Sequence, residues 1–255
     1  MRSWILIAAI AVACLAWTQG PDVPRLGWLL DDSGGLRPLT GLAGNFVPGD
    51  ALLDGVLSAG SSGDWTLAKT AHDLIVLDRV GVETSRIETP GGEALFAFAP
   101  NGEPAAAYFP GTGLVLLWTG DRFEAAGWTI GQDEGVLSVA CPESRTVAYL
   151  ARRGDAIWQV DRAASSGQIT REQLLPGVGA PALLGTNGSV LYADGKALVL
   201  RMPETGELRL DLPGSPAALG QVAGGWISVR LADRQLAVAF FGGRPRAYEL
   251  PAGAR

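Results

Sequence analysis

Short apolar runs of four to six residues, separated by glycine, proline, asparagine and aspartate, recur along the chain from about residue 56 to residue 250. The runs show no sustained i, i+3, i+4 spacing, which an amphipathic helix requires. They are also shorter than a typical helix, and the residues that bound them are typical of turns. The pattern therefore predicts an all-β protein built from many short strands.

These runs group into a unit that occurs five times, with a turn-to-turn spacing of roughly 36 to 44 residues. Each unit begins with a strand rich in small residues, then a tight turn and a second strand. The predicted turns are Ser62-Gly63, Asn101-Gly102, Glu143-Ser144, Asn187-Gly188 and Gly224-Gly225. Asn-Gly and Gly-Gly pairs favour two-residue hairpins, because the central residues of such turns have positive φ.

A continuously apolar third strand follows each hairpin, and a more polar, alternating fourth strand closes each unit. The third strands are predicted at residues 74–78, 114–118, 156–160, 197–201 and 235–239, and the fourth at 84–88, 122–126, 172–175, 207–212 and 246–250. Strands covered on both faces are continuously apolar, and repeats of this length are typical of propeller blades. The unit is therefore interpreted as one blade of a β-propeller, with its small-residue strand on the axis.

The segment before residue 56 is less regular. Residues 27–31 and 36–40 are interpreted as the third and fourth strands of a further unit, around the turn at 32–35. The final unit already has four strands, so no N-terminal strand is needed to complete it. The sequence thus predicts a β-propeller of about six blades with four antiparallel strands each, the first blade being short; five and seven blades are the alternatives.

Ala99-Pro100-Asn101-Gly102 stands where bacterial WD40-like and TolB-type propeller repeats usually have Ser-Pro-Asp-Gly. The third strands resemble the segment of that family in which two apolar residues precede Trp or Asp. The resemblance covers about residues 56 to 250 and implies a propeller fold. The Trp-Asp dipeptide of eukaryotic WD40 blades and its supporting histidine are absent, so the hydrogen-bonded tetrad of those proteins is not carried over.

The N-terminus has the features of an export signal: Met1-Arg2 gives an early positive charge, and residues 5–17 form an apolar run. A basic start followed by an apolar stretch of about 7–15 residues is typical of a secretory signal. A membrane-spanning helix needs about 20 apolar residues. We therefore expect residues 1–20 to be a signal segment and residues 21–255 to be a single propeller domain, in a periplasmic or extracellular protein. An uncleaved anchor is the alternative.

Ala11-Val12-Ala13 fits the small-x-small pattern for cleavage after Ala13, which places Cys14 at the new N-terminus. Ala11-Val12-Ala13-Cys14 resembles a degenerate bacterial lipobox in which Ala replaces the usual first Leu. Cys14 is therefore a candidate for lipid attachment. The alternative is that Cys14 is one more small apolar residue of the signal.

The chain has 20 Lys and Arg against 26 Asp and Glu, a net charge of −6. This acidity argues against a nucleic-acid partner, which requires clustered Lys and Arg, and against docking on anionic lipid. Of the two cysteines, Cys141 alone would remain in the mature chain. With one Cys and one His, neither a disulfide nor a zinc site is expected. A monomer is expected.

Candidates for catalysis are few. His72, the only histidine, lies between two predicted strands, and no Gly-x-Ser-x-Gly motif accompanies it. Acidic residues at predicted turns are Asp31, Asp32, Asp64, Asp133, Glu134 and Asp194. Oxygen-rich loops can bind Ca²⁺, but the sequence contains no Asp-x-Asp-x-Asp-Gly loop. No cofactor is therefore expected, with Ca²⁺ as the alternative.

A non-catalytic binding or scaffold propeller is the leading functional hypothesis, with a protein, peptide or glycan partner held by loops on one face. Loops on a rigid scaffold commonly carry function. The alternative is a metal-assisted hydrolase or lactonase, in which carboxylates converge on the axis. The predicted first strands are nearly free of carboxylates, which favours the binding hypothesis.

Overall fold

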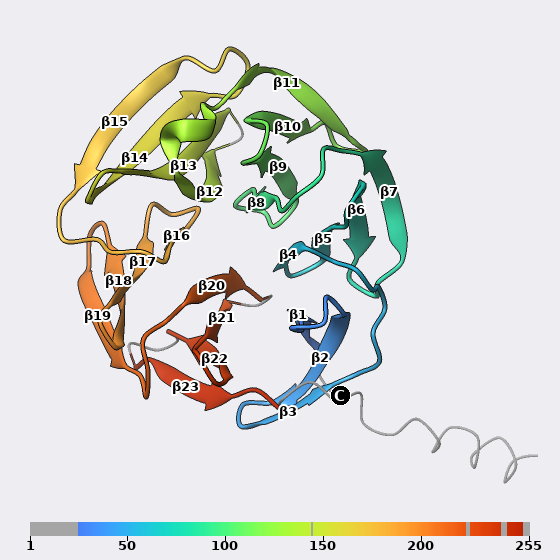
Figure 1. Ribbon diagram of the computed structural model, residues 1–255, viewed down its shortest axis with the longest axis vertical. Helices are drawn as coiled ribbons and strands as arrows, with labels where there is room; N and C mark the ends of the chain where they lie inside the picture. The colour runs from blue at the N-terminus through green and yellow to red at the C-terminus, as the bar shows by residue number, and fades with distance from the viewer. Residues whose placement is uncertain (1–24, 144, 223–224, 241–243, 252–255) are drawn as a thin grey trace, which may run out of the picture.

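A computed structural model describes residues 25–143, 145–222, 225–240 and 244–251. Across these residues it contains 23 β-strands and one short 3₁₀ helix, η1 (Gln132–Glu134). The strands form six sheets arranged as a ring around one axis (Figure 1). The predicted six-bladed propeller with a short first blade is therefore confirmed. The predicted signal segment 1–20, including Cys14, lies outside the described residues.

Each sheet is one blade, and its strands pair antiparallel in chain order. Blade 1 consists of β1 (Arg25–Leu30), β2 (Leu36–Leu42) and β3 (Asn45–Pro48). Blade 2 consists of β4 (Ser58–Ser62), β5 (Trp65–Lys69), β6 (Asp73–Asp78) and β7 (Glu83–Glu88). Blade 3 consists of β8 (Leu95–Phe98), β9 (Pro104–Phe109), β10 (Leu114–Trp118) and β11 (Phe123–Thr129).

The other three blades also have four strands. Blade 4 consists of β12 (Val136–Glu143), β13 (Thr146–Arg153), β14 (Ala156–Ala163) and β15 (Ile169–Leu175). Blade 5 consists of β16 (Ala182–Leu184), β17 (Val190–Asp194), β18 (Ala197–Met202) and β19 (Gly206–Asp211). Blade 6 consists of β20 (Ala218–Gln221), β21 (Trp226–Arg230), β22 (Gln235–Ala239) and β23 (Arg246–Glu249), so it is completed by C-terminal residues alone, as predicted.

The two ends of the ring differ in the turns that they carry. In blades 2 to 6 the turns from first to second strand lie at one end, which we call the mouth face. Because neighbouring strands are antiparallel, the turns from second to third strand and the links between blades lie at the other end, which we call the opposite face. The mouth face carries the site described below.

Blade 1 departs from the prediction in the position of its strands. Its first turn, at residues 31–35, lies beside residues 231–234, which form the second-to-third-strand turn of blade 6, in a shared surface cavity. The turn is therefore at the opposite face, so β1 and β2 occupy the second and third positions of the blade. They were predicted to be the third and fourth strands. The short β3, which the sequence pattern did not predict, takes the fourth position, and no described residue occupies the innermost position.

Five innermost strands therefore surround the axis of a six-bladed ring. β4, β8, β12, β16 and β20 each contact the next, and β20 contacts β4. β1 lies farther from the axis than these five strands (Figure 1).

The hairpins with Asn-Gly turns also differ from the prediction. In the β8–β9 hairpin the N–H of Gly102 donates to the carbonyl of Ala99, and the N–H of Ala99 donates to the carbonyl of Glu103. This is a three-residue loop, and Gly102 takes its left-handed position at φ +86°. Two-residue turns of type I′ would need positive φ at Asn101 as well, and the described residues include no non-glycine residue with positive φ.

The hydrophobic core lies between blades rather than at the axis. Each pair of neighbouring blades shares a cluster of side chains from its middle strands. Trp118 packs against the cluster between blades 2 and 3, and Trp158 packs against the cluster between blades 3 and 4. Within the part of the chain that the structure describes, no helix has the length and apolar character to cross a membrane.

Candidate functional site

Four first-to-second-strand turns line a cavity of about 670 Å³ at the mouth face. They come from blades 2, 3, 5 and 6 and are separated by up to about 165 residues of sequence. The volume falls within the range of about 300–1,000 Å³ that is usual for ligand sites. We call this cavity the axial mouth.

The lining of the axial mouth is rich in side chains that form hydrogen bonds. Its hydroxyls and amides are Ser61, Ser62, Asn101, Thr186, Asn187 and Gln221, and its two carboxylates are Asp64 and Glu103. No Lys, Arg or His belongs to the described lining. The site therefore has many donors and acceptors together with an excess of negative charge.

Local hydrogen bonds fix two of the turns. The Asn101 side chain accepts from the N–H of Glu103 at 3.1 Å and donates to the Glu103 carboxylate at 3.0 Å. Asn187 accepts from the N–H of Ser189 at 3.0 Å. Ser62 on blade 2 donates to the carbonyl of Gly102 on blade 3, which joins the two turns. These hydrogen bonds fix the shape of the rim.

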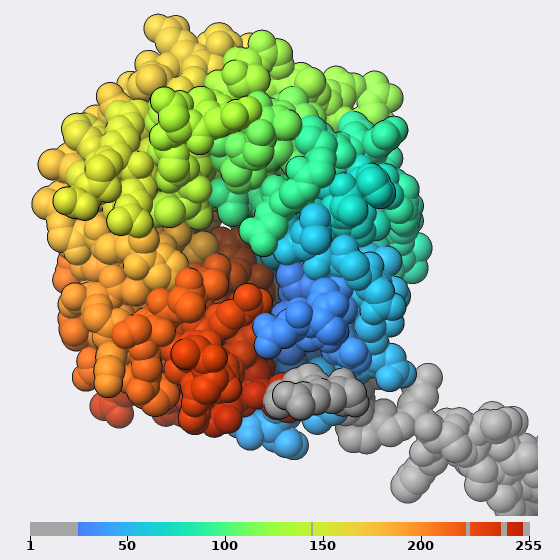
Figure 2. Space-filling model, in the orientation of Figure 1, coloured from blue at the N-terminus to red at the C-terminus, as the bar shows by residue number. Residues whose placement is uncertain are grey.

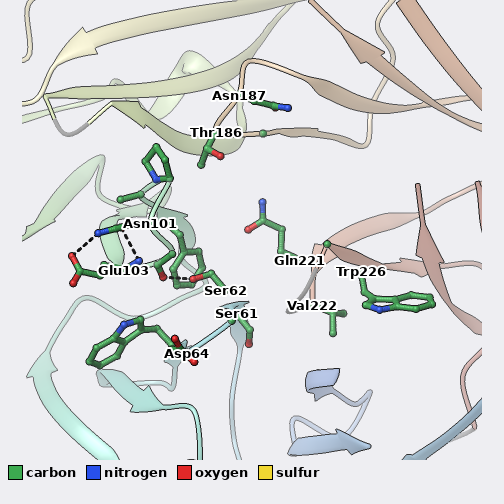
Figure 3. Close-up of a pocket in the computed structure, with 18 of the residues that line it drawn as sticks. Ser61, Ser62, Asp64, Asn101, Glu103, Thr186, Asn187, Gln221, Val222 and Trp226 are labelled. Atoms are coloured by element: carbon green, nitrogen blue, oxygen red, sulfur yellow. Dashed lines mark hydrogen bonds between the residues drawn. The ribbon is translucent and has the colours of Figure 1, made fainter. Parts of the chain in front are cut away.

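Gln221 extends from β20 into the space between the turns (Figure 3). Thr186 and Asn187 face it from blade 5, while Asn101 and Glu103 lie to one side on blade 3. The Gln221 side chain is partly exposed and forms no hydrogen bond with any described residue. An amide in this position can both donate to and accept from a bound molecule.

Aromatic side chains add apolar area to the same lining. Trp65, Phe98 and Trp226 belong to it, and Trp65 lies 6.3 Å from Trp118 between ring centroids. Trp226 is directed away from the cavity centre (Figure 3) and packs at the junction of blades 1 and 6. Aromatic side chains are enriched at protein recognition surfaces.

The structure does not gather the catalytic candidates of the sequence at one place. His72 is exposed at the opposite face, where its carbonyl accepts from the N–H of Thr89 at 2.8 Å. Of the acidic candidates, only Asp64 lines the axial mouth. Over the described residues, no group of three or more His, Cys, Asp or Glu is arranged to hold a metal ion.

Arginine side chains pair with several of these acidic residues. Glu134 contacts Arg153 at 2.9 Å, and Asp194 contacts Arg209 at 2.6 Å. Asp32 lies 3.5 Å from Arg230. The first two pairs lie at blades 4 and 5, and the third joins blade 1 to blade 6, so these carboxylates do not converge on the axis.

Asp31 is the most strongly perturbed carboxylate. Burial alone would raise its pKa, but hydrogen bonds from Ser33, Arg37 and Gly35 outweigh burial and lower the pKa to about 2. The Arg37 Nε donates at 2.6 Å, and the N–H of Gly35 donates at 2.8 Å. Asp31 therefore stabilises the first turn of blade 1 and remains ionised at any physiological pH.

Two buried groups lie away from the axial mouth. Burial raises the pKa of the Cys141 thiol to about 12, so the thiol is protonated and unreactive in the folded protein. Lys69 is fully buried at the end of β5. Burial lowers its pKa, opposed by the nearby charge of Asp73, and its ammonium donates to the carbonyl of Thr70.

Apart from Asp64, the polar residues of the axial mouth were not identified as site candidates from the sequence, although their turns were predicted. In the sequence, Asn101-Gly102 and Asn187-Gly188 predicted hairpin turns and no site. All first-to-second-strand turns of a propeller share one face, so the polar residues beside those turns meet at the mouth. That topological rule was the available signal.

No protein-family model matches the chain, and no curated protein matches it. Among solved structures, TolB from Acinetobacter baumannii matches with a TM-score of 0.56 and 11% identity, over 96% of this chain and 68% of that chain. The propeller fold is what they share. A streptogramin B lyase structure matches with a TM-score of 0.50 and 14% identity, over 91% of this chain and 85% of that chain. The predicted resemblance to TolB-type propellers is therefore confirmed for the fold, and at these identities the similarity concerns the fold alone.

Proposed function

We propose that this protein is a non-catalytic binding module that holds an extended peptide, or a loop of a partner protein, in the axial mouth. The observation that carries the proposal is the lining: two carboxylates, six amide or hydroxyl side chains and no described cation. Amides and hydroxyls pair with the N–H and C=O groups of a peptide backbone. The carboxylates favour a partner that presents Lys or Arg.

The geometry suits recognition better than catalysis. A general acid or base works within hydrogen-bond reach of the reacting group and usually has a shifted pKa. Asp64 and Glu103, the carboxylates of the axial mouth, lie on different blades, and Asp31, the carboxylate whose pKa is strongly lowered, lies at the opposite face. Elemental analysis of the purified protein tests the enzyme alternative, because one bound metal ion per chain would contradict a non-catalytic module.

Peptide binding is tested by titrating the protein with fluorescein-labelled decapeptides of basic, neutral and acidic composition and following anisotropy. The basic peptide is expected to bind at least ten times more tightly than the acidic one, and its affinity should fall as salt is raised. Equal affinity for all three peptides would contradict the proposal.

Charge removal at the site provides the matched comparison. The double variant Asp64→Asn/Glu103→Gln is expected to weaken binding of the basic peptide about tenfold, roughly 1.4 kcal/mol. The control Asp211→Asn removes an exposed carboxylate on the outer strand β19 and should leave affinity unchanged. If the control weakens binding as much as the double variant, the attraction is general rather than a property of the axial mouth.

We further propose that the protein is exported. The support is the basic start and apolar run at its N-terminus. Residues 1–30 fused to a reporter enzyme that is active only outside the cytoplasm should give activity, and the variant Leu6→Asp/Ile10→Asp should abolish it. A reporter that stays inactive with the natural segment would contradict export.

A further inference from the structure

The inner edge of β1 faces the axis without a strand beside it among the described residues. On the outer side of blade 1, the N–H of Leu36 donates to the carbonyl of Leu53 at 2.8 Å. The carbonyl of Pro38 accepts from the N–H of Gly49, also at 2.8 Å. Leu36 and Pro38, both on β2, therefore direct these backbone groups away from β1.

The β1 residues opposite Leu36 and Pro38 are Leu30 and Trp28. In an antiparallel ladder, two opposed residues either bond to each other or both face away from each other. Trp28 and Leu30 therefore direct their N–H and C=O groups toward the axis. Leu29, which lies between them, bonds instead to its partner on β2.

The axial backbone groups of β1 have no partner among the described residues. Trp28 is 6% exposed, and neither it nor Leu30 forms a backbone hydrogen bond on the axial side with any described residue. Buried backbone N–H and C=O groups are almost always paired, because an unpaired group loses its hydrogen bonds to water without replacement. A sheet edge with unpaired groups is a template for one more strand.

A cavity of about 210 Å³, which we call the axial slot, adjoins this edge. Its lining includes residues 28–30 of β1, 57–59 and 61 at β4, and 218–222 at β20. Figure 2 shows a recess at the centre of the ring, between the blue residues of blade 1 and the brown-orange residues of blade 6. Ser61, Gln221 and Val222 line both the axial slot and the axial mouth. A chain held in the mouth therefore has a path into the slot.

The axial slot suits a chain with small side chains. β4 and β20, which border it, also contact each other. Seating a strand beside β1 moves them apart, and the displacement is smallest when the side chains of that strand are small. The neighbouring innermost strand β4 meets the same restriction with the sequence Ser-Ala-Gly-Ser-Ser. Glycine, alanine and serine are therefore the residues expected in the slot.

We propose that the peptide held in the axial mouth extends its N-terminal residues into the axial slot, where they add a short strand to the free edge of β1. The inference rests on the proposed function, because the peptide reaches this edge through the mouth. Strand addition of this kind obtains affinity from main-chain hydrogen bonds and selectivity from the fit of alternate side chains. The partner is then a protein with a free N-terminal segment, in which small residues precede Lys or Arg.

The direction of entry follows from the pairing in the complete blades. There the innermost strand is antiparallel to the second strand. β1 occupies the second position and runs from the mouth face to the opposite face. A peptide that repeats this pairing runs from the opposite face toward the mouth, so its N-terminus lies deepest. The basic residues that follow then lie at the mouth, beside Asp64 and Glu103.

Amide hydrogen exchange of the full exported chain, with and without peptide, tests the pairing. The peptide begins with Ser-Ala-Gly-Ser, continues with a basic segment and carries fluorescein at its C-terminus, so that anisotropy reports saturation. At saturation the amides of Trp28 and Leu30 are expected to exchange about ten times more slowly than in the free chain. The amide of Leu29 is the internal control, because it bonds to β2 in both states.

The outcomes separate this inference from the proposed function. If anisotropy reports binding and the amides of Trp28 and Leu30 exchange as they do in the free chain, the inference is overturned and peptide binding stands. If no peptide binds, both are overturned. If the two amides are already as protected in the free chain as in the complex, another segment covers the edge and the inference is overturned.

Changes in the peptide give a second readout that leaves the protein intact. Moving Ser-Ala-Gly-Ser to the C-terminal end, at unchanged composition, should remove the protection of Trp28 and Leu30. Replacing it by Ile-Phe-Ile-Phe should remove the protection too, because large side chains do not fit the slot. Both peptides keep the basic segment, so binding at the mouth should persist in anisotropy. Equal protection by all three peptides overturns the inference.

Methylation of single peptide nitrogens tests the main-chain hydrogen bonds. Alternate residues of a strand direct their N–H to the same neighbour, so only one of the second and third peptide residues donates to β1. Of the two N-methylated peptides, one should lose the protection of Trp28 and Leu30, and the other should keep most of it. Full protection by both N-methylated peptides overturns the inference.

Discussion

Blades 3 and 4 meet along one continuous stretch of chain, whereas blades 1 and 6 meet only where the two ends of the described sequence come together. The first interface buries eleven side chains in one cluster, among them Tyr108, Tyr149 and Val160. The second, which we call the seam, buries five: Leu29, Leu39, Phe46, Ala237 and Leu250.

Aromatic packing dominates the seam. Phe46 of blade 1 lies edge-on to Trp226 and Tyr248 of blade 6, at centroid distances of 5.5 and 6.0 Å. No strand of one blade pairs with a strand of the other among the described residues. Such edge-to-face pairs add about 0.5–1.5 kcal/mol beyond their buried area. The ring is therefore closed by side chains rather than by a shared sheet, and we expect local opening to begin at the seam.

The rate at which a reagent labels the Cys141 thiol measures how often the interface between blades 3 and 4 opens. This residue is 4% exposed in that cluster, and burial raises the pKa of its thiol to about 12. An ordinary thiol has a pKa nearer 9, so the thiolate is about 1,000 times scarcer in the folded protein at neutral pH. In a protein with Cys14→Ser, a disulfide reagent should label Cys141 at least 1,000 times more slowly than it does in denaturant. Rapid labelling under native conditions would show that this interface opens as readily as the seam.

The variants Phe46→Ala and Phe109→Ala compare the seam with a continuous interface. Phe46 is buried at the seam, and Phe109 is buried between blades 2 and 3. Each substitution should lower the free energy of unfolding by about 3–5 kcal/mol, because removal of a buried ring leaves a cavity. The two should differ in hydrogen exchange: Phe46→Ala should expose amides of β2, β3 and β23 through local opening, while Phe109→Ala should expose all blades together.

Labelling of Cys141 serves as the control for that comparison. If the seam opens locally, Phe46→Ala should leave the native labelling rate almost unchanged. An equal acceleration by Phe46→Ala and Phe109→Ala would mean that the ring unfolds as one unit from either place.

Asp31 stabilises the seam side of blade 1 through its charge. Its folded pKa of about 2 lies below the unfolded value near 3.8, so it contributes about 2 kcal/mol of stability at neutral pH. Since the folded pKa is depressed, this contribution is complete above the unfolded pKa and is lost as the pH falls toward 2. Asp31→Asn should therefore lower the free energy of unfolding by about 2 kcal/mol at pH 7 and by progressively less below pH 4.

Denaturant titrations at several pH values check this prediction. The matched control is Asp32→Asn, at a neighbouring carboxylate whose side chain is 89% exposed. It should change stability little at any pH. If Asp31→Asn destabilised the protein equally from pH 7 to pH 2, the packing of the Asp31 side chain rather than its negative charge would be the source of its stabilising effect.

The repeat, the strand order in blades 2 to 6 and the short first blade were predictable because each depends on local patterning. Small residues at Ser58–Gly60 and the apolar run at Leu74–Leu77 identify a first and a third strand without reference to the rest of the chain. The positions of β1 and β2 in blade 1 were not predictable in the same way. A turn such as residues 31–35 can stand at either end of a blade, and only its packing beside residues 231–234 fixes which end it takes.

The axial mouth depends on the closed ring, which local patterns do not encode. Gln221 and Thr186 meet there because blades 5 and 6 are placed side by side by core packing. Their turns were visible in the sequence, but the angle between blades decides which side chains face the axis. Sequence patterning therefore identified the scaffold, and the site emerged only from its assembly.

The smallest change in stability is expected from removing the ion pair that spans the seam. This experiment distinguishes closure of the ring by charge from closure by aromatic packing. Arg230 of blade 6 lies 3.5 Å from Asp32 of blade 1, with side chains 49% and 89% exposed. Exposed pairs of this kind contribute about 0–1 kcal/mol, so Arg230→Ala should change stability by no more than about 0.5 kcal/mol. Arg209→Ala, which removes an exposed arginine within blade 5, is the control for losing a surface charge. If Arg230→Ala speeds exchange at β2, β3 and β23 as Phe46→Ala does, charge holds the ends of the chain together. If it matches Arg209→Ala, the aromatic cluster alone closes the ring.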